Sequence, residues 1–201
     1  VTNIDWPSQK GLSSVQQQQE FIQILNKLQA AGFNAVIVQI RPAADAFYPS
    51  DYEPWSEFLS GVQGKAPSPY YDPLKFMIEE AHKRNMEFHA WLNPYRAVFD
   101  IKKSSVAPNH ITKKRKDWFL TYGTKKYFNP GIPGVMTYVT TVVKDIISRY
   151  DIDAIHMDDY FYPYRIKGKE FPDYKAYQQY GKGMGKDEWR RSNCDSIIKM
   201  I

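Results

Sequence analysis

Strands and helices alternate along this chain, and this alternation constrains the fold more than any single motif does. Apolar residues at helical spacing predict helices over residues 15–31, from Asp72-Pro73 onward, over about 134–150, and over 187–201. Apolar runs between them predict strands over residues 33–40, 87–93 and 154–158. No hairpin signal separates these strands, so we predict an α/β fold with a parallel sheet and right-handed connections.

The segments that join these elements differ in length. Long segments follow the strands, at residues 41–71, 94–128 and 160–186, whereas links from helix to strand are brief, as at Gly32 and residues 84–86. This asymmetry places the elaborate surface at the carboxyl ends of the strands, as in a (β/α)8 TIM barrel. A doubly wound sheet shares the alternation, but the chain has no GxGxxG motif for its phosphate site.

The strand faces also favour a barrel. Gln39 and Arg41 share one face of their strand, and His89, Trp91 and Asn93 share one face of the next. Doubly wound sheets bury both faces under helices and tend to be apolar on both, so polar faces indicate a barrel interior.

The chain is shorter than a complete barrel. Such a barrel needs about 250 residues and eight strand–helix units, whereas we count about four units here, beginning near the end of a first strand. We therefore expect residues 1–201 to form a single partial barrel domain, roughly the N-terminal half, which continues beyond residue 201 in the parent protein.

Composition excludes several classes of protein. With 43% hydrophobic and 24% charged residues the chain is typical of globular domains, and no apolar run approaches the roughly 20 residues that cross a bilayer. The single cysteine, Cys194, excludes an intrachain disulfide and argues against a cysteine metal site. The net charge of +5 is concentrated in part at residues 113–116. No glycine-rich phosphate loop, zinc-finger spacing or aromatic RNA-binding motif accompanies it, so we expect no cofactor and no nucleic-acid partner.

Two acids, Asp158 and Asp159, lie at the end of the last predicted strand and precede three aromatic residues. Strand alternation puts His156 and Asp158 on one face, and Asp159 lies at or just past the strand end. Acids at the carboxyl edge of a parallel sheet occupy the place where such folds keep their chemistry. A capping or loop-bridging role is the simpler alternative for Asp158.

Four stretches of the chain together resemble one family. They are residues 38–48 (VQIRPAADAFY), the run from 71 to 96 ending in HAWLNPYR, residues 128–131 (FNPG) and residues 156–163 (HMDDYFYP). In this order and spacing they resemble the glycosyl hydrolase-like 10 family, also called DUF187. The resemblance implies a bacterial (β/α)8 glycosidase-like domain that is exported or lipid-anchored, with peptidoglycan glycan strands among its substrates.

Glycoside cleavage needs two carboxyl groups, about 5 to 9.5 Å apart. We predict that Asp158 is one of them, as the acid/base, and that Asp45 or a residue outside this chain is the other. Asp159 is expected to take part in catalysis, to bind sugar hydroxyls or to hold the loop. The chain therefore leaves open whether the anomeric configuration is retained or inverted.

The expected substrate-binding residues fall into three kinds. Arg41 and Arg96 can clamp a substrate carboxylate or neutralise the nearby acids. His156 can bond Asp158, while Asn93 and Asn129 offer a donor and an acceptor to sugar hydroxyls. The aromatic residues that could stack on a pyranose ring, or fill the core instead, are Trp6, Trp91, Tyr95, Tyr160 and Tyr162.

Two functions compete with a glycosidase. A non-catalytic carbohydrate-binding barrel would use the aromatics to hold sugar and the acids only to orient hydroxyls. A metal-dependent hydrolase would need His89, His156, Asp158 and Asp159 as ligands, but no HxH or HExxH spacing is present. We expect a glycan partner and an extracytoplasmic location, with a possible lipid anchor in the parent protein.

Overall fold

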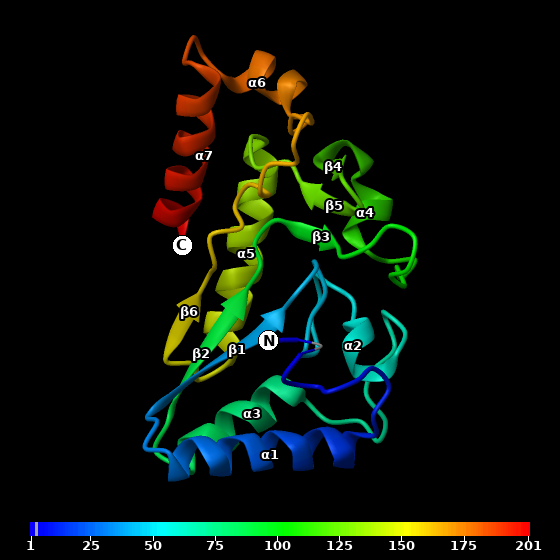
Figure 1. Ribbon diagram of the computed structural model, residues 1–201, viewed down its shortest axis with the longest axis vertical. Coiled ribbons are helices and arrows are strands. Elements are labelled where there is room, and N and C mark those ends of the chain that lie inside the picture. The colour runs from blue at the N-terminus through cyan, green and yellow to red at the C-terminus, as the bar shows by residue number, and fades with distance from the viewer. Residues whose placement is uncertain (3) are drawn as a thin grey trace.

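The computed structural model describes residues 1–2 and 4–201. Its central sheet has the order β1-β2-β6, with β1 spanning Ala35–Arg41, β2 Glu87–Leu92 and β6 Ala154–His156. Both strand pairs are parallel, as predicted. Figure 1 shows the three strands running side by side, with the N-terminus close to the carboxyl end of β1.

Four main helices accompany this sheet at the predicted places. They are α1 (Ser14–Ala30), α3 (Pro73–His82), α5 (Pro133–Arg149) and α7 (Lys186–Met200). Asp72 caps α3, which has Pro73 in its first turn, as the Asp72-Pro73 start of the predicted helix indicates, and Ser13 and Gln16 form a capping box on α1 that was not predicted.

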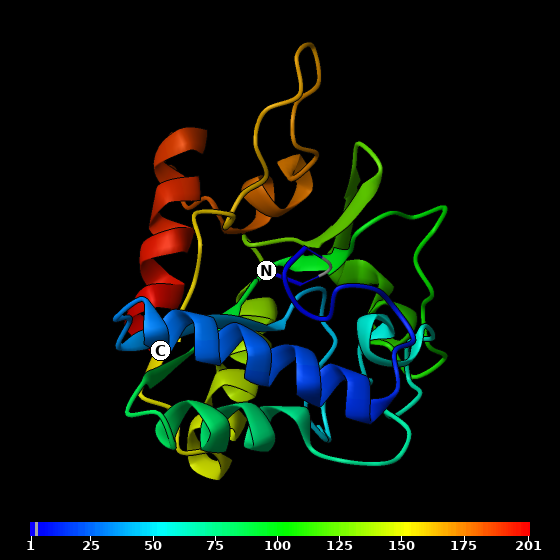
Figure 2. The ribbon, with the colours of Figure 1, turned by 60° about the horizontal axis from the view of Figure 1, so that its bottom comes forward.

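The outer face of the sheet packs on helices. Val38 and Ile40 of β1 and Phe88, Ala90 and Leu92 of β2 belong to one buried cluster with apolar residues of α1, α3 and α5. Figure 1 shows α1 and α3 lying across one end of the molecule, and Figure 2 shows the two helices side by side. Burial of this face fixes the strand register, because a slip of one residue would turn every apolar side chain away from the helices.

The segment between β2 and α5 differs from the prediction. It contains an antiparallel sheet of order β3-β5-β4, formed by Arg96–Val98, Lys125–Phe128 and Phe119–Tyr122. The expectation that the chain lacks hairpins is therefore wrong here. Gly123, with φ 62°, supplies the left-handed turn between β4 and β5. This glycine was the sequence signal from which the hairpin could have been predicted.

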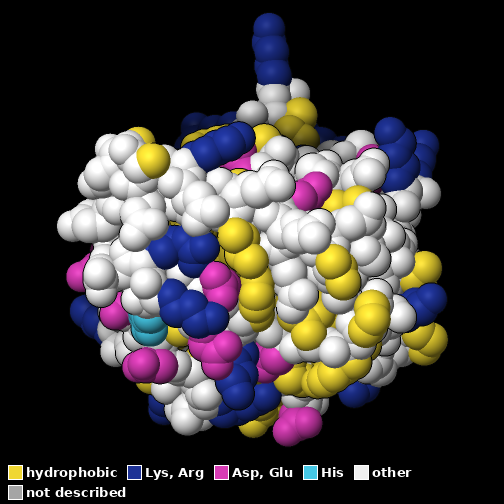
Figure 3. All heavy atoms as spheres, turned by 90° about the horizontal axis from the view of Figure 1, so that it is seen from below, with side chains coloured by type: hydrophobic (Ala, Val, Ile, Leu, Met, Phe, Trp, Pro, Cys, Tyr) yellow, Lys and Arg dark blue, Asp and Glu magenta, His cyan; other side chains and the backbone are white. Residues whose placement is uncertain are grey.

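The remaining elements are short and lie in the long segments that follow strands. They are α2 (Glu57–Ser60), α4 (Ile111–Lys114), the 3-10 helix η1 (Lys116–Trp118) and α6 (Tyr174–Tyr180). Among the described residues, no helix is both long and apolar enough to span a membrane. The face of the molecule in Figure 3 carries interspersed Lys, Arg, Asp and Glu side chains and no continuous basic patch.

Candidate active site

A line of polar side chains crosses the carboxyl ends of the three parallel strands. The Thr2 backbone N–H donates to Gln39 Oε1 (3.1 Å), and Gln39 Nε2 donates to Asn93 Oδ1. Asn93 Nδ2 in turn donates to Asp158 Oδ2 (2.7 Å). A backbone N–H can only donate, so it fixes the orientation of both amides and leaves Asp158 as the acceptor at the end of the line.

Asp158 is half-buried and both of its oxygens accept hydrogen bonds. Oδ1 accepts the backbone N–H of Tyr160 (3.2 Å), in addition to the bond that Oδ2 accepts from Asn93. The carboxyl group is therefore held in place through both of its oxygens.

Asp158 opens onto a pocket of about 460 Å³, a size usual for ligand sites. The pocket draws residues from the N-terminal segment, from all three parallel strands or their ends, and from the segments around α2 and after β3. Those that concern the chemistry are Gln39, Glu57, Trp91, Arg96, Asp158 and Tyr160.

Arg96 is a cation of this pocket whose charge interacts with Asp158. Its guanidinium lies 5.5 Å from the centre of the Tyr160 ring and 4.7 Å from that of Phe99, and Nη1 donates to Asn93 Oδ1 (3.3 Å). Burial lowers the pKa of Arg96, and the negative charge of Asp158 opposes that shift. Arg96 and Tyr160 thus form a stacked pair in the pocket of Asp158, and their contacts with a substrate stay a prediction.

Trp91 also lines the pocket, whereas His156 lies beside it. The two rings meet edge to face with centroids 5.9 Å apart, and both residues are half-buried. Trp91 Nε1 is buried and has no hydrogen-bond partner among residues 1–2 and 4–201. The side chain of His156 makes no hydrogen bond to Asp158 in the described part of the chain; its contact is with Trp91.

Arg41 does not take the position that strand alternation predicts. The register shifts between Gln39 and Arg41, so Arg41 lies opposite Leu92. Such a bulge re-aims the side chains that follow it. Arg41 is fully buried and pairs with Glu53 through Nε (2.7 Å) and Nη2 (2.5 Å), and its Nη1 donates to the Asn93 carbonyl (2.6 Å). The expectation that Arg41 clamps a substrate carboxylate does not fit this burial; it supports the end of β2 instead.

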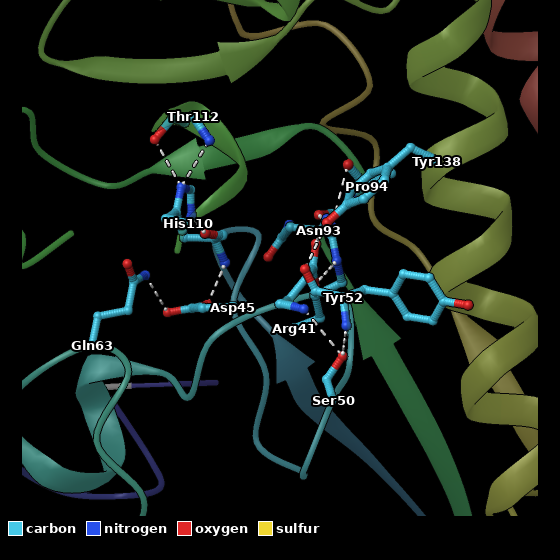
Figure 4. A network of polar contacts seen from close by, with 12 residues as sticks. Arg41, Asp45, Ser50, Tyr52, Gln63, Asn93, Pro94, His110, Thr112 and Tyr138 are labelled. Atoms are coloured by element: carbon cyan, nitrogen blue, oxygen red, sulfur yellow. Dashed lines mark hydrogen bonds and ion pairs between the residues drawn. The ribbon is translucent and has the colours of Figure 1, made fainter. Parts of the chain in front are cut away.

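Asp45 is also buried, in a polar network next to that ion pair (Figure 4). Its Oδ1 accepts the Ala43 N–H (3.0 Å) and its Oδ2 accepts from Gln63 Nε2 (3.2 Å). Burial raises the pKa of Asp45 to about 6. Asp45 does not line the Asp158 pocket. The structure therefore does not bring Asp45 and Asp158 together in one pocket, although Asp45 was predicted as a candidate for the second catalytic carboxyl group.

His110 closes this network and can be assigned a tautomer. Its Nδ1 accepts the Thr112 backbone N–H (3.2 Å) and caps α4, so Nε2 carries the proton and faces the Ala43 carbonyl (3.3 Å). Burial lowers the pKa of His110, which keeps the ring neutral. This network holds the turn after β1 in place. Its four members are the side chains of Asp45, Gln63 and His110 and the backbone of Ala43.

The other predicted site residues are dispersed. Asp159 is exposed, and its Oδ2 accepts the Tyr164 hydroxyl (2.6 Å). Tyr162 lies in a different pocket, where its hydroxyl accepts from Asn193 Nδ2 (3.0 Å). Asn129 is buried and uses Oδ1 to accept the Gly131 N–H (3.1 Å), which is a turn-forming role.

Two predicted stacking residues are core residues. Trp6 is 4% exposed, packs edge to face on Phe21 (5.4 Å), and donates Nε1–H to the Gln17 carbonyl (2.8 Å). Tyr95 is fully buried and packs against Phe161 (6.2 Å). Neither ring face is free for a sugar, which corrects the expectation that both contact substrate.

The metal-site alternative finds no support in the described part of the chain. Residues 1–2 and 4–201 contain no cluster of three or more His, Cys, Asp or Glu side chains that could hold an ion. Of the four residues that it requires, His89 pairs with Glu87 (2.9 Å) and Asp159 with Tyr164.

Several residues that line the Asp158 pocket were not predicted as site residues from the sequence. Gln39 was assigned to the inner face but not to the site, and Glu57 and Asp100 were not considered at all. Glu57 is ion-paired with Lys10 (2.6 Å), whose ammonium lies 4.8 Å from the centre of the Phe58 ring. Both acids come from segments far along the chain from β6, and no local motif marks them.

Comparison with known proteins identifies the family. The model of the family described as glycosyl hydrolase-like 10 matches residues 1–201. The chain is 55% identical over 206 residues to glycosyl hydrolase YngK of Bacillus subtilis, covering all of this chain and 40% of that protein. It is 36% identical over 221 residues to glycosyl hydrolase DigH of Escherichia coli K12, covering all of this chain and 49% of that protein. The chain thus spans half or less of the length of these curated relatives.

The fold has relatives among solved structures. An α-galactosidase from Thermus thermophilus, TtGalA, matches 94% of this chain and 35% of its own with a TM-score of 0.51 and 14% sequence identity. This likeness confirms the prediction of a partial TIM-barrel fold. The match of the family model along the whole chain shows that the chain belongs to the glycosyl hydrolase-like 10 family.

Proposed function

We propose that this chain provides the Asp158 half of the active site of a glycoside hydrolase that cleaves a bacterial glycan. The observation that carries the proposal is the carboxylate of Asp158, held by Asn93 and the Tyr160 N–H at the mouth of a pocket with Trp91, Arg96 and Tyr160. Membership of a glycosyl hydrolase-like family and a glycosidase-type fold support it.

Asp158 acts as one carboxyl group of the catalytic pair. Both of its oxygens accept hydrogen bonds, which favours the carboxylate role, as nucleophile or general base, over the acid role in the resting site. The neighbouring Arg96 would stabilise that charge, and the Tyr160 ring would support the sugar.

The second carboxyl group is either Glu57, Asp100 or a residue from outside this chain. Glu57 and Asp100 line the same pocket as Asp158, which Asp45 does not. Glu57 is neutralised by Lys10, so its use as an acid would require that ion pair to open.

The proposed substrate is the glycan strand of peptidoglycan, and the proposed location is extracytoplasmic, with a lipid anchor as a possible attachment of the parent protein. Arg96 offers a cation to the lactyl carboxylate of a muramic acid unit, next to an aromatic ring that suits the pyranose face. The family resemblance points to the same glycan.

The test is to incubate the full-length protein with three glycans: peptide-free peptidoglycan strands, chitin oligosaccharides, and an α-galactoside. Chitin shares the N-acetylglucosamine backbone but lacks the lactyl carboxylate, so it is the matched control. Saccharides released from the peptidoglycan strands, and to a much smaller extent from chitin, are expected by mass spectrometry. Faster release from chitin or the α-galactoside would reject the substrate, and release from none would reject the hydrolase.

A second candidate function is glycan binding without cleavage. It is favoured by one observation: both other acids of the described pocket already have partners, since Glu57 is ion-paired with Lys10 (2.6 Å) and Asp100 Oδ1 accepts the Lys102 N–H (2.8 Å). Retention of peptidoglycan strands by the protein, with unchanged strand length after long incubation, would support this function.

A further inference from the structure

A second pocket, of about 520 Å³, lies between α7 and the loop that joins β6 to α6. Figure 2 shows this loop projecting from the molecule above α6. The pocket is separate from the one around Asp158, and no residue lines both. Its volume falls within the range of small-ligand sites.

The floor of this pocket is aromatic and fixed in place. Phe171 packs edge to face on Tyr122 (5.5 Å) and on Tyr162 (5.6 Å). The Tyr122 hydroxyl accepts the Ile166 N–H (2.7 Å) and donates to the Lys169 carbonyl (2.8 Å). These two bonds attach the projecting loop to the β4–β5 hairpin, so the pocket is formed before any ligand arrives.

The lining of the pocket carries unpaired positive charge. It includes four cations, Arg165, Lys169, Arg190 and Arg191, and two acids, Glu170 and Asp187.

Both acids have partners. Glu170 lies 2.6 Å from Lys186, and Asp187 lies 3.7 Å from Arg190. Arg190 is itself held by Asp173 through Nε (2.8 Å) and Nη2 (2.7 Å). Arg165, Lys169 and Arg191 form no ion pair within residues 1–2 and 4–201. The site therefore presents a surplus of cations above an apolar floor, which suits an anion with an apolar face.

One short segment separates the two pockets. Asp158 and Tyr160 line the first, and Tyr162 and Pro163 line the second. Phe161 between them packs on the buried ring of Tyr95. Since residues 160 and 162 are at most about 7 Å apart along an extended chain, the two pockets adjoin the same segment.

We propose that the pocket lined by Tyr162, Arg165 and Arg191 is a second glycan-binding site, which takes a carboxylate-bearing sugar unit of the strand that enters the Asp158 pocket. The proposal rests on the proposed function for the identity of the strand. What it adds to that function is the location of the second site, the preference of this site for a negatively charged sugar unit, and the residues that confer the preference.

The experiment measures binding of a muramic acid-containing, peptide-free oligosaccharide by calorimetry, and of the same oligosaccharide with its carboxylates converted to methylamides. The full-length protein carries Asp158→Asn in every sample, so that cleavage does not consume the ligand. A double variant with Arg165→Ala and Arg191→Ala is compared with a double variant with Lys167→Ala and Lys199→Ala. The lysine variant removes the same charge from exposed positions that do not line the pocket.

The arginine pair of substitutions is expected to weaken binding of the charged oligosaccharide about ten-fold or more, the loss expected for one charge-assisted hydrogen bond. It should leave the methylamide form unchanged, and the lysine pair should change neither. The proposal would be overturned by equal losses of affinity in the arginine and lysine variants. It would also be overturned if the protein with both arginines intact bound the charged and the methylamide oligosaccharides equally well, or bound neither of them. Charge-dependent binding without any cleavage by the protein with native Asp158 would reject the hydrolase and leave the second site standing.

Discussion

Asn93 donates a 2.7 Å hydrogen bond to Asp158 and thereby joins the carboxyl ends of β2 and β6. The bond ends a line that begins at the backbone of Thr2 and passes through Gln39. Every side chain in that line is oriented by the one before it. The position of the Asp158 carboxylate is therefore set by residues on all three parallel strands or their ends.

Asn93→Ala is expected to lower kcat for glycan cleavage about 100-fold, because a displaced catalytic carboxylate can cost that much. KM should change far less, since Asn93 does not line the pocket. Steady-state kinetics on peptide-free glycan measures both. Asn26→Ala, at an exposed position on α1, is the control. An unchanged kcat would show that Asn93 does not position Asp158.

Tyr160→Ala is expected to raise KM or weaken glycan binding, because the ring lines the pocket and stacks with Arg96. Loss of one aromatic contact corresponds to about 1 kcal/mol, or five-fold in affinity. Trp6→Phe should lower the melting temperature and leave binding intact, since Trp6 is in the core. The opposite pattern would restore Trp6 as a binding residue.

Glu53→Gln is expected to lower the free energy of unfolding by about 3–5 kcal/mol, because it leaves the buried Arg41 charge without its partner. Denaturant unfolding measures the change. Asp117→Asn breaks the exposed pair between Arg115 and Asp117 and should have no measurable effect. A similar small effect from both substitutions would mean that Arg41 is solvated in the folded protein.

The pH dependence of stability should carry a contribution from Asp45. Its pKa rises from 3.8 to about 6 on folding because of burial. The folded protein therefore binds this proton more strongly, and the resulting stabilisation is present below pH 4 and lost as the pH rises through 6. The loss is roughly 3 kcal/mol.

Asp45→Asn isolates this contribution. The free energy of unfolding of the wild type, minus that of Asp45→Asn, should fall between pH 4 and pH 7. The same difference for Asp51→Asn, at an exposed position, should stay flat. A flat difference for Asp45 would show that its carboxylate is solvated.

Much of the fold follows from periodicity and caps. The helix starts at Ser13 and Asp72 and the parallel strands 35–41, 87–92 and 154–156 lie within a few residues of prediction, because capping chemistry and apolar spacing are local. The antiparallel sheet at 96–128 was missed, since its strands have at most four residues and their pairing is decided by tertiary packing.

The site was less predictable than the fold. Asp158, Arg96 and Tyr160 meet in one pocket because they follow neighbouring strand ends, which is a topological consequence. Arg41 was misplaced because a bulge breaks the alternation on which its prediction depended. Trp6 and Tyr95 were misplaced because sequence alone does not distinguish a buried loop aromatic from an exposed one.

The most direct test of the role of Asp158 compares the wild type with Asp158→Asn on peptide-free peptidoglycan glycan, by mass spectrometry of the products over time. Asp159→Asn is the matched control, because this neighbouring acid is exposed and bonded to Tyr164. We expect new saccharides from the wild type and from Asp159→Asn, and a rate at least about 100-fold lower from Asp158→Asn, as for loss of a catalytic proton-transfer group. Equal release by the wild type and Asp158→Asn would contradict a catalytic role for Asp158.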